Sequence, residues 1–116
     1  MDHAEISALR QLLEDRPEID PGTVTVYATM EPCLMCYVTM LLNGIRRFVY
    51  AYEDAMGGGT GLNLDDQKPL FREMQVEVVP DVCRAESLVL FKEFFRNPDN
   101  DYWQDSLLEK YTLEQP

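Results

Sequence analysis

Two cysteines three residues apart follow a proline in the stretch Glu31-Pro32-Cys33-Leu34-Met35-Cys36. Pro32 suits the first position of a helix, because its missing N–H would have no partner there. Residues three apart share one face of a helix, and the free N–H groups and dipole at a helix N-terminus favour thiolate over thiol. The spacing therefore predicts a helix over 32–43 that presents Cys33 and Cys36 as a thiolate pair, which is half of a zinc site.

The nitrogen ligand for such a site can come only from His3, the single histidine of the chain, which lies two residues before Glu5. Two thiolates and one imidazole leave the fourth position of a tetrahedral ion for water, as in catalytic zinc sites. A carboxylate beside the metal can take the proton of that water and pass it to a leaving group. We therefore expect one Zn²⁺ per chain, held by His3, Cys33 and Cys36, with Glu5 as the catalytic proton shuttle. The alternative is a pair of core cysteines, a stray histidine and an ordinary glutamate in the first turn of a helix.

His3-Ala4-Glu5 followed by Pro32-Cys33-Leu34-Met35-Cys36 resembles the signature of the zinc-dependent cytidine and adenosine deaminases. In that superfamily hydroxide on zinc attacks the amine-bearing carbon of a base, and a glutamate that is not a ligand moves the protons. The resemblance implies a hydrolytic deaminase that acts on the exocyclic amine of a nucleobase or nucleoside.

Three further residues are candidates for substrate contact. The resemblance implies that the backbone around Ala28 and Glu31 touches the base, although Glu31 could instead cap the helix. Asp54 follows the second predicted strand, and ligands of open α/β sheets gather at the carboxyl ends of the strands. A solvated loop aspartate is the alternative for Asp54.

The hydrophobic pattern predicts helices that alternate with strands. Helices are expected over 3–15, 32–43, 68–74, 81–96 and 102–111, and strands over 23–28, 46–52 and 76–79. Gly44 is expected to end the second helix, and the glycine-rich stretch 57–61 is expected to be a tight or flexible loop. Cys83 has neither a second histidine nor a paired cysteine beside it, so it is interpreted as a small buried apolar residue.

Strands joined through helices predict parallel neighbours in a layered sheet. A helix between the second and third strands is similar to the tRNA adenosine deaminase and guanine deaminase branch of the superfamily. The resemblance implies an α/β protein with the three-layer α/β/α cytidine deaminase-like fold and a central mixed sheet, lacking the first helix and the first two strands. We expect a catalytic domain over residues 1–96, incomplete at its N-terminus, and a C-terminal helical extension over residues 97–116.

The strand at 23–28 is then expected to be an exposed edge. A lost or unrecorded N-terminus, a partner chain that completes the sheet, or a genuine minimal variant would each account for the missing part, and the first two are favoured. In the extension, Tyr102, Trp103 and Tyr111 could stack on a base or close the pocket of a neighbouring subunit. Packing of the last helix against the domain is the preferred interpretation.

A formal net charge of −11 and a pI of about 4.3 count against extensive phosphate contact. We therefore expect a small nucleobase or nucleoside substrate and a homodimer, with adenosine in tRNA as the alternative substrate. A non-catalytic zinc-binding subunit completed by a partner chain is the rival from a different class. The chain has no apolar run of membrane-spanning length and no evident secretory signal, and its three cysteines fit a reducing, cytoplasmic compartment.

Overall fold

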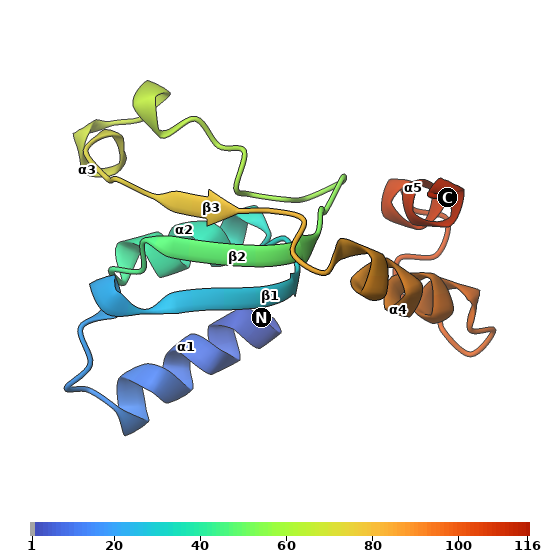
Figure 1. The fold of residues 1–116 in the computed structure, drawn as a ribbon, viewed down its shortest axis with the longest axis horizontal. Helices are drawn as coiled ribbons and strands as arrows, with labels where there is room; N and C mark the ends of the chain where they lie inside the picture. The colour runs from blue at the N-terminus through green and yellow to red at the C-terminus, as the bar shows by residue number, and fades with distance from the viewer. Residues whose placement is uncertain (1) are drawn as a thin grey trace.

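The computed structural model describes residues 2–116 as a small parallel sheet with five α-helices (Figure 1). In chain order the elements are α1 (Ala4–Asp15), β1 (Thr25–Met30), α2 (Leu34–Leu42), β2 (Arg47–Tyr52), α3 (Pro69–Arg72), β3 (Glu77–Val79), α4 (Arg84–Arg96) and α5 (Leu107–Glu114). Short 3-10 turns lie at Pro21–Thr23 and Leu64–Asp66. The predicted order of helices and strands is confirmed, with ends displaced by a few residues.

The sheet has the order β1-β2-β3, and both pairs of strands are parallel. Val26, Phe48 and Val78 lie side by side across it. Each connection passes through a helix, and a crossover of this kind returns the chain in the same direction. The resemblance implied a mixed sheet, whereas every strand pair among the described residues is parallel.

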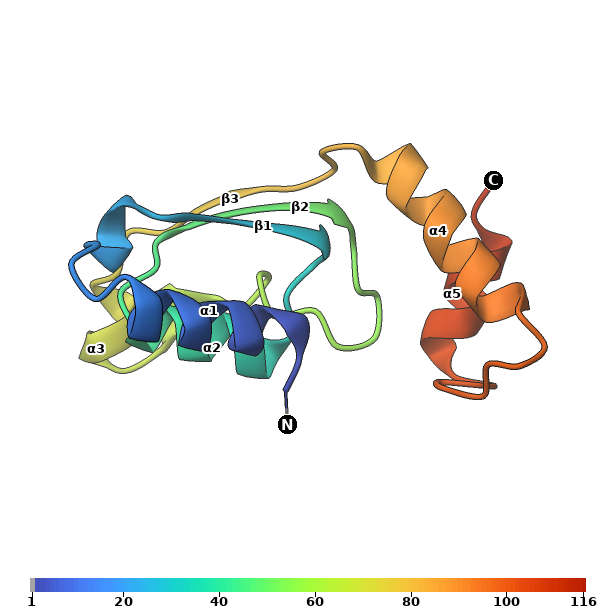
Figure 2. The same cartoon turned by 90° about the horizontal axis from the view of Figure 1, so that it is seen from below.

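Helices α1 and α2 cover one face of the sheet and form the core with it (Figure 2). The buried core cluster consists of Leu9, Tyr37, Met40, Leu41, Ile45 and Phe48. Helix α2 ends as predicted at Gly44, whose φ of 95° suits glycine. The N–H of Gly44 donates to the carbonyl of Leu41, and the N–H of Ile45 donates to that of Met40. This Schellman motif terminates the helix and directs the chain into β2.

The opposite face of the sheet is largely open, because α4 and α5 lie beyond the carboxyl ends of the strands (Figures 1 and 2). Tyr27 on that face is 76% exposed. The three-layer arrangement implied by the resemblance would place helices there. The chain turns away after β3 through two residues with left-handed backbone, Asp81 and Cys83. Cys83 is exposed at the N-cap position of α4, so its interpretation as a buried residue was wrong.

The exposed edge predicted for the first strand is confirmed in β1. Within residues 2–116, this strand pairs only with β2. Beside its free edge lies a groove of about 470 Å³, lined mainly by apolar residues of α1 and β1, among them Ala8, Leu12, Val24 and Met30. An unpaired strand edge beside an apolar groove is a surface on which another strand can add.

A polar cluster fixes α4 and α5 to the end of β2. Arg84 donates two hydrogen bonds, of 2.8 and 2.7 Å, to the carboxylate of Glu53, and the hydroxyl of Tyr111 donates a third of 2.7 Å. The hydroxyl of Tyr52 donates to Thr112 at 3.0 Å, and both residues are buried. These contacts join residues that lie far apart in the chain. Helices α4 and α5 also pack on each other, although the expected domain boundary at residue 97 lies between them. That boundary stays a prediction.

Glu53→Gln is expected to lower the free energy of unfolding at pH 7 by about 1–2 kcal/mol, because it removes a charge-assisted bidentate pair that is partly screened by solvent. The hydrogen bonds from Arg84, assisted by that from Tyr111, lower the pKa of Glu53 to about 2. A lowered pKa stabilises the fold above the unfolded-state value near 4.5, and that stability is lost as the pH falls from about 5 towards 2. Urea unfolding at several pH values measures both effects.

The matched control is Glu93→Gln, which neutralises an exposed carboxylate on α4, the helix that carries Arg84. Glu53→Gln should reduce the pH dependence of stability between pH 5 and 2, while Glu93→Gln should leave it unchanged. Equal stability curves for wild type and Glu53→Gln would contradict this role for the pair.

Candidate metal centre

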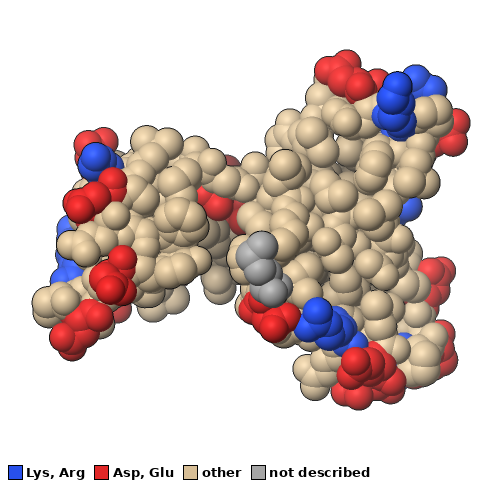
Figure 3. Space-filling model, turned by 180° about the vertical axis from the view of Figure 1, so that it is seen from behind, with Lys and Arg blue, Asp and Glu red and all other residues tan. Residues whose placement is uncertain are grey.

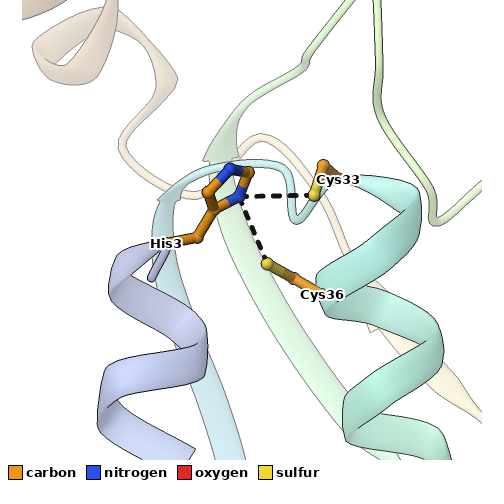
Figure 4. Close-up of side chains that lie close together, drawn as sticks. All are labelled: His3, Cys33 and Cys36. Atoms are coloured by element: carbon orange, nitrogen blue, oxygen red, sulfur yellow. Dashed lines mark hydrogen bonds between the residues drawn. The ribbon is translucent and has the colours of Figure 1, made fainter. Parts of the chain in front are cut away.

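His3, Cys33 and Cys36 come together at the carboxyl ends of the strands (Figure 4). Nδ1 of His3 lies 3.5 Å from Sγ of Cys33 and 3.4 Å from Sγ of Cys36. The three ligand atoms lie within 4.8 Å of one another. His3 comes from the N-cap of α1, Cys33 is the N-cap of α2 and Cys36 lies in the first turn of α2. Residues thirty positions apart therefore form one cluster, as the spacing predicted.

The separations fit a tetrahedral zinc ion. Zn–S and Zn–N bonds of about 2.3 and 2.0–2.1 Å at a tetrahedral angle place sulfur and nitrogen about 3.5 Å apart. Both observed distances agree with this value. Without a cation, burial is the largest cause that raises the pKa of the Cys36 thiol to about 12, with added effects from Cys33 and Glu5. A bound metal reverses this preference because it deprotonates its thiol ligands.

Glu5 lies beside the cluster without being one of its three members. Its Oε2 is 3.8 Å from Sγ of Cys36. Glu5 occupies the first turn of α1, two residues after His3, and its side chain is half-buried. The helix that supplies the imidazole thus also places a carboxylate next to the three donor atoms.

A loop at the end of β2 holds the cysteine segment in place. Gly59 donates its N–H to the carbonyl of Pro32 at 2.9 Å, and Leu34 donates to the carbonyl of Gly57 at 3.3 Å. Gly59 is required for this approach, since a Cβ there would lie 2.6 Å from Cα of Leu34. Helix α2 begins at Leu34 rather than at Pro32, because Cys33 remains extended as the N-cap and bridges to Gly58.

The carboxylate of Glu31 is engaged by this same loop. It accepts hydrogen bonds from the N–H of Asp54 at 3.2 Å, the N–H of Thr60 at 3.1 Å and the hydroxyl of Thr60 at 2.6 Å. Asp54 in turn accepts from the N–H groups of Met56 and Gly57, at 3.0 and 2.9 Å. Glu31 and Asp54 thus shape the loop through these bonds, and both also line the cleft in front of the metal centre.

Ala28 lies elsewhere, on β1 beside the groove at the free edge of the strand, and is not among the residues that line the cleft. Substrate contact by Ala28, Glu31 and Asp54 remains a prediction. The sequence did not reveal the role of Glu31 in shaping the loop, because its contacts with Asp54 and Thr60 span 23 and 29 residues.

Glu31→Gln is expected to weaken zinc binding about 10- to 100-fold. This is the usual effect of removing a group that does not touch the metal but orients its ligands through hydrogen bonds. The amide nitrogen of glutamine cannot accept the hydrogen bonds that Thr60 donates, so the loop is released from Pro32 and Cys33. Competition with a chromogenic chelator measures the change. Thr60→Val should cause part of the same loss and Thr60→Ser, which keeps the hydroxyl, little of it. Wild-type zinc affinity in Glu31→Gln would show that the loop does not support the ligands.

The metal centre opens into a cleft of about 820 Å³. One wall carries His3, Glu5, Glu31, Cys33 and Asp54, and the other carries apolar and aromatic residues of α4, α5 and the segment between them. That second wall consists of Leu90, Phe91, Phe94, Phe95, Tyr102, Trp103 and Leu108. The sequence predicted a helix over 81–96. It did not indicate that residues of this helix face the metal centre, since the turn after β3 decides this.

Comparison with known proteins agrees with the geometry. The family described as the cytidine and deoxycytidylate deaminase zinc-binding region matches residues 1–52. The chain is 30% identical over 98 residues to a tRNA-specific adenosine deaminase of Agrobacterium fabrum, covering 81% of this chain and 62% of that protein. It is 29% identical over 93 residues to the tRNA-specific adenosine deaminase subunit tad2 of Schizosaccharomyces pombe, covering 80% of this chain and 24% of that protein.

A solved structure from studies of A-to-I editing by tRNA:A34 deaminases at the wobble position has the same fold. It aligns with a TM-score of 0.55 and 26% identity, over 76% of this chain and 64% of that one. The chain therefore spans less than two thirds of the length of these relatives. Among residues 2–116, no helix combines the length and apolar character needed to cross a bilayer.

The cofactor is zinc, for which His3, Cys33 and Cys36 provide the donor set. The α/β fold matches that of a tRNA deaminase, and the histidine–glutamate and cysteine motifs lie within the matched region. On these grounds residues 1–52 match the cytidine and deoxycytidylate deaminase zinc-binding region, and the chain is similar in sequence and fold to tRNA-specific adenosine deaminases.

Proposed function

We propose that this chain catalyses the hydrolytic deamination of adenosine within tRNA, giving inosine. The observation that carries the proposal is the placement of Glu5 3.8 Å from Cys36, beside a three-residue zinc site at the floor of a cleft. A structural zinc site has four protein donors, whereas this cluster has three and a carboxylate beside them. The relatives supply the reaction class, since their names specify adenosine in tRNA.

Each residue of the site has a separate part in this reaction. His3, Cys33 and Cys36 would hold the ion, which supplies a Lewis acid that activates a water molecule. Glu5 accepts a proton, delivers it to the purine ring nitrogen and assists the departure of ammonia. Glu31 holds the loop by hydrogen bonds, and the loop in turn fixes the position of Cys33 at the mouth of the cleft.

The proposal of a tRNA substrate replaces the small nucleobase or nucleoside that was expected from the net charge. A charge of −11 lowers the affinity for phosphates, but it does not determine what enters the cleft. The relatives that match over four fifths of this chain are named as tRNA deaminases, which supports the alternative of the sequence-based interpretation. A tRNA substrate also agrees with the expected cytoplasmic location.

The experiment is a substrate panel with zinc-loaded protein. Ammonia release and inosine formation are measured for adenine, guanine, cytosine, their nucleosides, a tRNA with adenosine at the wobble position and the matching stem-loop. Inosine formation in the RNA alone, or at a kcat/KM far above that for free adenosine, supports the proposal. Faster turnover of a free base or nucleoside overturns the choice of substrate.

The rival function is a zinc-binding subunit that needs a partner chain. Two observations favour it: one relative is named as a subunit, and β1 presents a free edge beside an apolar groove. A panel that shows no turnover with this chain alone, but turnover after a partner is added, would support the partner requirement. A homodimer and a heteromeric partner are then distinguished by the mass of the active species.

A further inference from the structure

The wall opposite the metal centre ends in two aromatic side chains that are half open to solvent. Tyr102 is 58% exposed and Trp103 is 47% exposed, and both line the cleft. Their rings meet edge to face at 5.4 Å, and Tyr102 meets Phe94 in the same manner at 6.5 Å. This contact leaves ring surface uncovered in the cleft, where a flat ligand can stack.

The charges of the cleft narrow the class of ligand. No lysine or arginine is among the described residues that line it, while Glu5, Glu31 and Asp54 stand on the metal wall. A phosphate group is therefore unfavourable inside the cleft. A neutral heterocycle is favourable, because its ring can stack on Trp103 or Tyr102 and its edge can reach polar groups. Viewed from behind, acidic atoms are visible in the notch between the two parts of the molecule (Figure 3).

The size of the cleft is the third observation. Its volume of about 820 Å³ is near the upper end of small-molecule sites, which measure about 300–1,000 Å³. A single purine at the metal uses one end of this space. The aromatic wall at the other end is then left to a second ring from the same substrate.

We propose that Tyr102 and Trp103 form a stacking platform for a nucleobase next to the one that is deaminated. This inference rests on the proposed function and extends it, because it makes a polynucleotide with at least two splayed bases the substrate. The platform supplies affinity through base stacking, which suits single-stranded nucleic acid, and leaves the phosphates outside the acidic cleft. It thereby accounts for a nucleic-acid substrate on a chain with a net charge of −11.

Trp103 is the single tryptophan of the chain, so its fluorescence reports on the platform directly. The Glu5→Ala protein, loaded with zinc, is titrated with an RNA stem-loop that carries adenosine in its loop. Stacking should quench and shift the emission of Trp103 as the RNA binds. A change that follows protein concentration without RNA would mean that the wall binds a second copy of the chain, and would overturn the proposal.

Affinity for the labelled stem-loop is measured by anisotropy in the same background. Trp103→Ala should weaken binding about 5- to 150-fold, the range that one lost base–aromatic stack corresponds to. Trp103→Phe should recover most of the loss because it keeps an aromatic face. The matched control is Tyr27→Ala, an exposed aromatic on the open face of the sheet outside this cleft, which should bind as the parent does.

RNA stacking on Trp103 and deamination are measured separately, so either can fail without the other. RNA deamination by wild type, with no quenching and no loss of affinity in Trp103→Ala, overturns the platform and leaves the deaminase. Quenching and loss of affinity without any deamination support the platform and overturn the proposed activity of this chain alone.

Discussion

Glu5→Ala is expected to lower kcat for RNA deamination about 10²- to 10⁴-fold while zinc content remains at one ion per chain. The carboxylate lies 3.8 Å from Cys36 but is not one of the three zinc donors, so its loss removes proton transfer without opening the metal centre. Glu5→Gln, which keeps the shape and removes the basic oxygen, should be similarly inactive. Zinc is measured by atomic emission and turnover by inosine formation.

The control for this prediction is Glu14→Ala, which removes an exposed carboxylate from the last turn of the same helix. It should have wild-type activity and metal content. Activity within a few-fold of wild type in both Glu5 variants would eliminate the assigned proton shuttle. Loss of zinc together with activity would instead make Glu5 part of the support of the metal centre. The experiment also tests the non-catalytic rival, for which neither variant changes any turnover.

Short-range features of the sequence were sufficient to predict which residues form the metal centre. The proline before Cys33, the three-residue spacing to Cys36 and the histidine two residues before Glu5 each act within one helical turn. Their meeting point follows from the parallel crossover, which brings the carboxyl end of β1 and both helix N-termini to one edge of the sheet. The stop of α2 at Gly44 was likewise predictable, because a left-handed residue is required there.

The position of α4 and α5 could not be predicted in the same way. It depends on Glu53, Arg84 and Tyr111, whose contacts span 31 and 58 residues, and on left-handed backbone at Asp81 and Cys83. Neither an aspartate nor a cysteine in a sequence indicates a left-handed backbone as strongly as a glycine does. The contacts of Tyr111 and Thr112 agree with the preferred packing of the last helix against the domain, whereas Tyr102 and Trp103 precede α5 and line the cleft. Hydrophobic periodicity identifies an apolar helix face but does not say which surface of the protein it meets.

Cys36→Ala is expected to abolish stoichiometric zinc binding and to remove the stabilisation that zinc provides. Saturation at a thousand times Kd stabilises a fold by about 4 kcal/mol, so the loss should appear as a drop in Tm of about 10–20 °C. Cys36 is fully buried at the start of α2, and its removal leaves two donors where the ion needs three. Colorimetric zinc release and thermal unfolding with and without added zinc measure the two effects.

A measurement on chelator-treated wild type separates the loss of stability caused by removing zinc from the loss caused by the cavity that alanine leaves. Its Tm should fall by the part of the loss that is due to zinc, and added zinc should restore it, whereas Cys36→Ala should not respond to zinc at all. Cys83→Ala is the matched control, because it removes the exposed cysteine that lies outside the cluster and should keep both zinc and Tm. If Cys36→Ala bound one zinc ion with a wild-type Tm, or Cys83→Ala lost it, the donor set would be wrong. The placement of Glu5 would then no longer identify a deaminase, since a proton shuttle acts only beside the water that the ion activates.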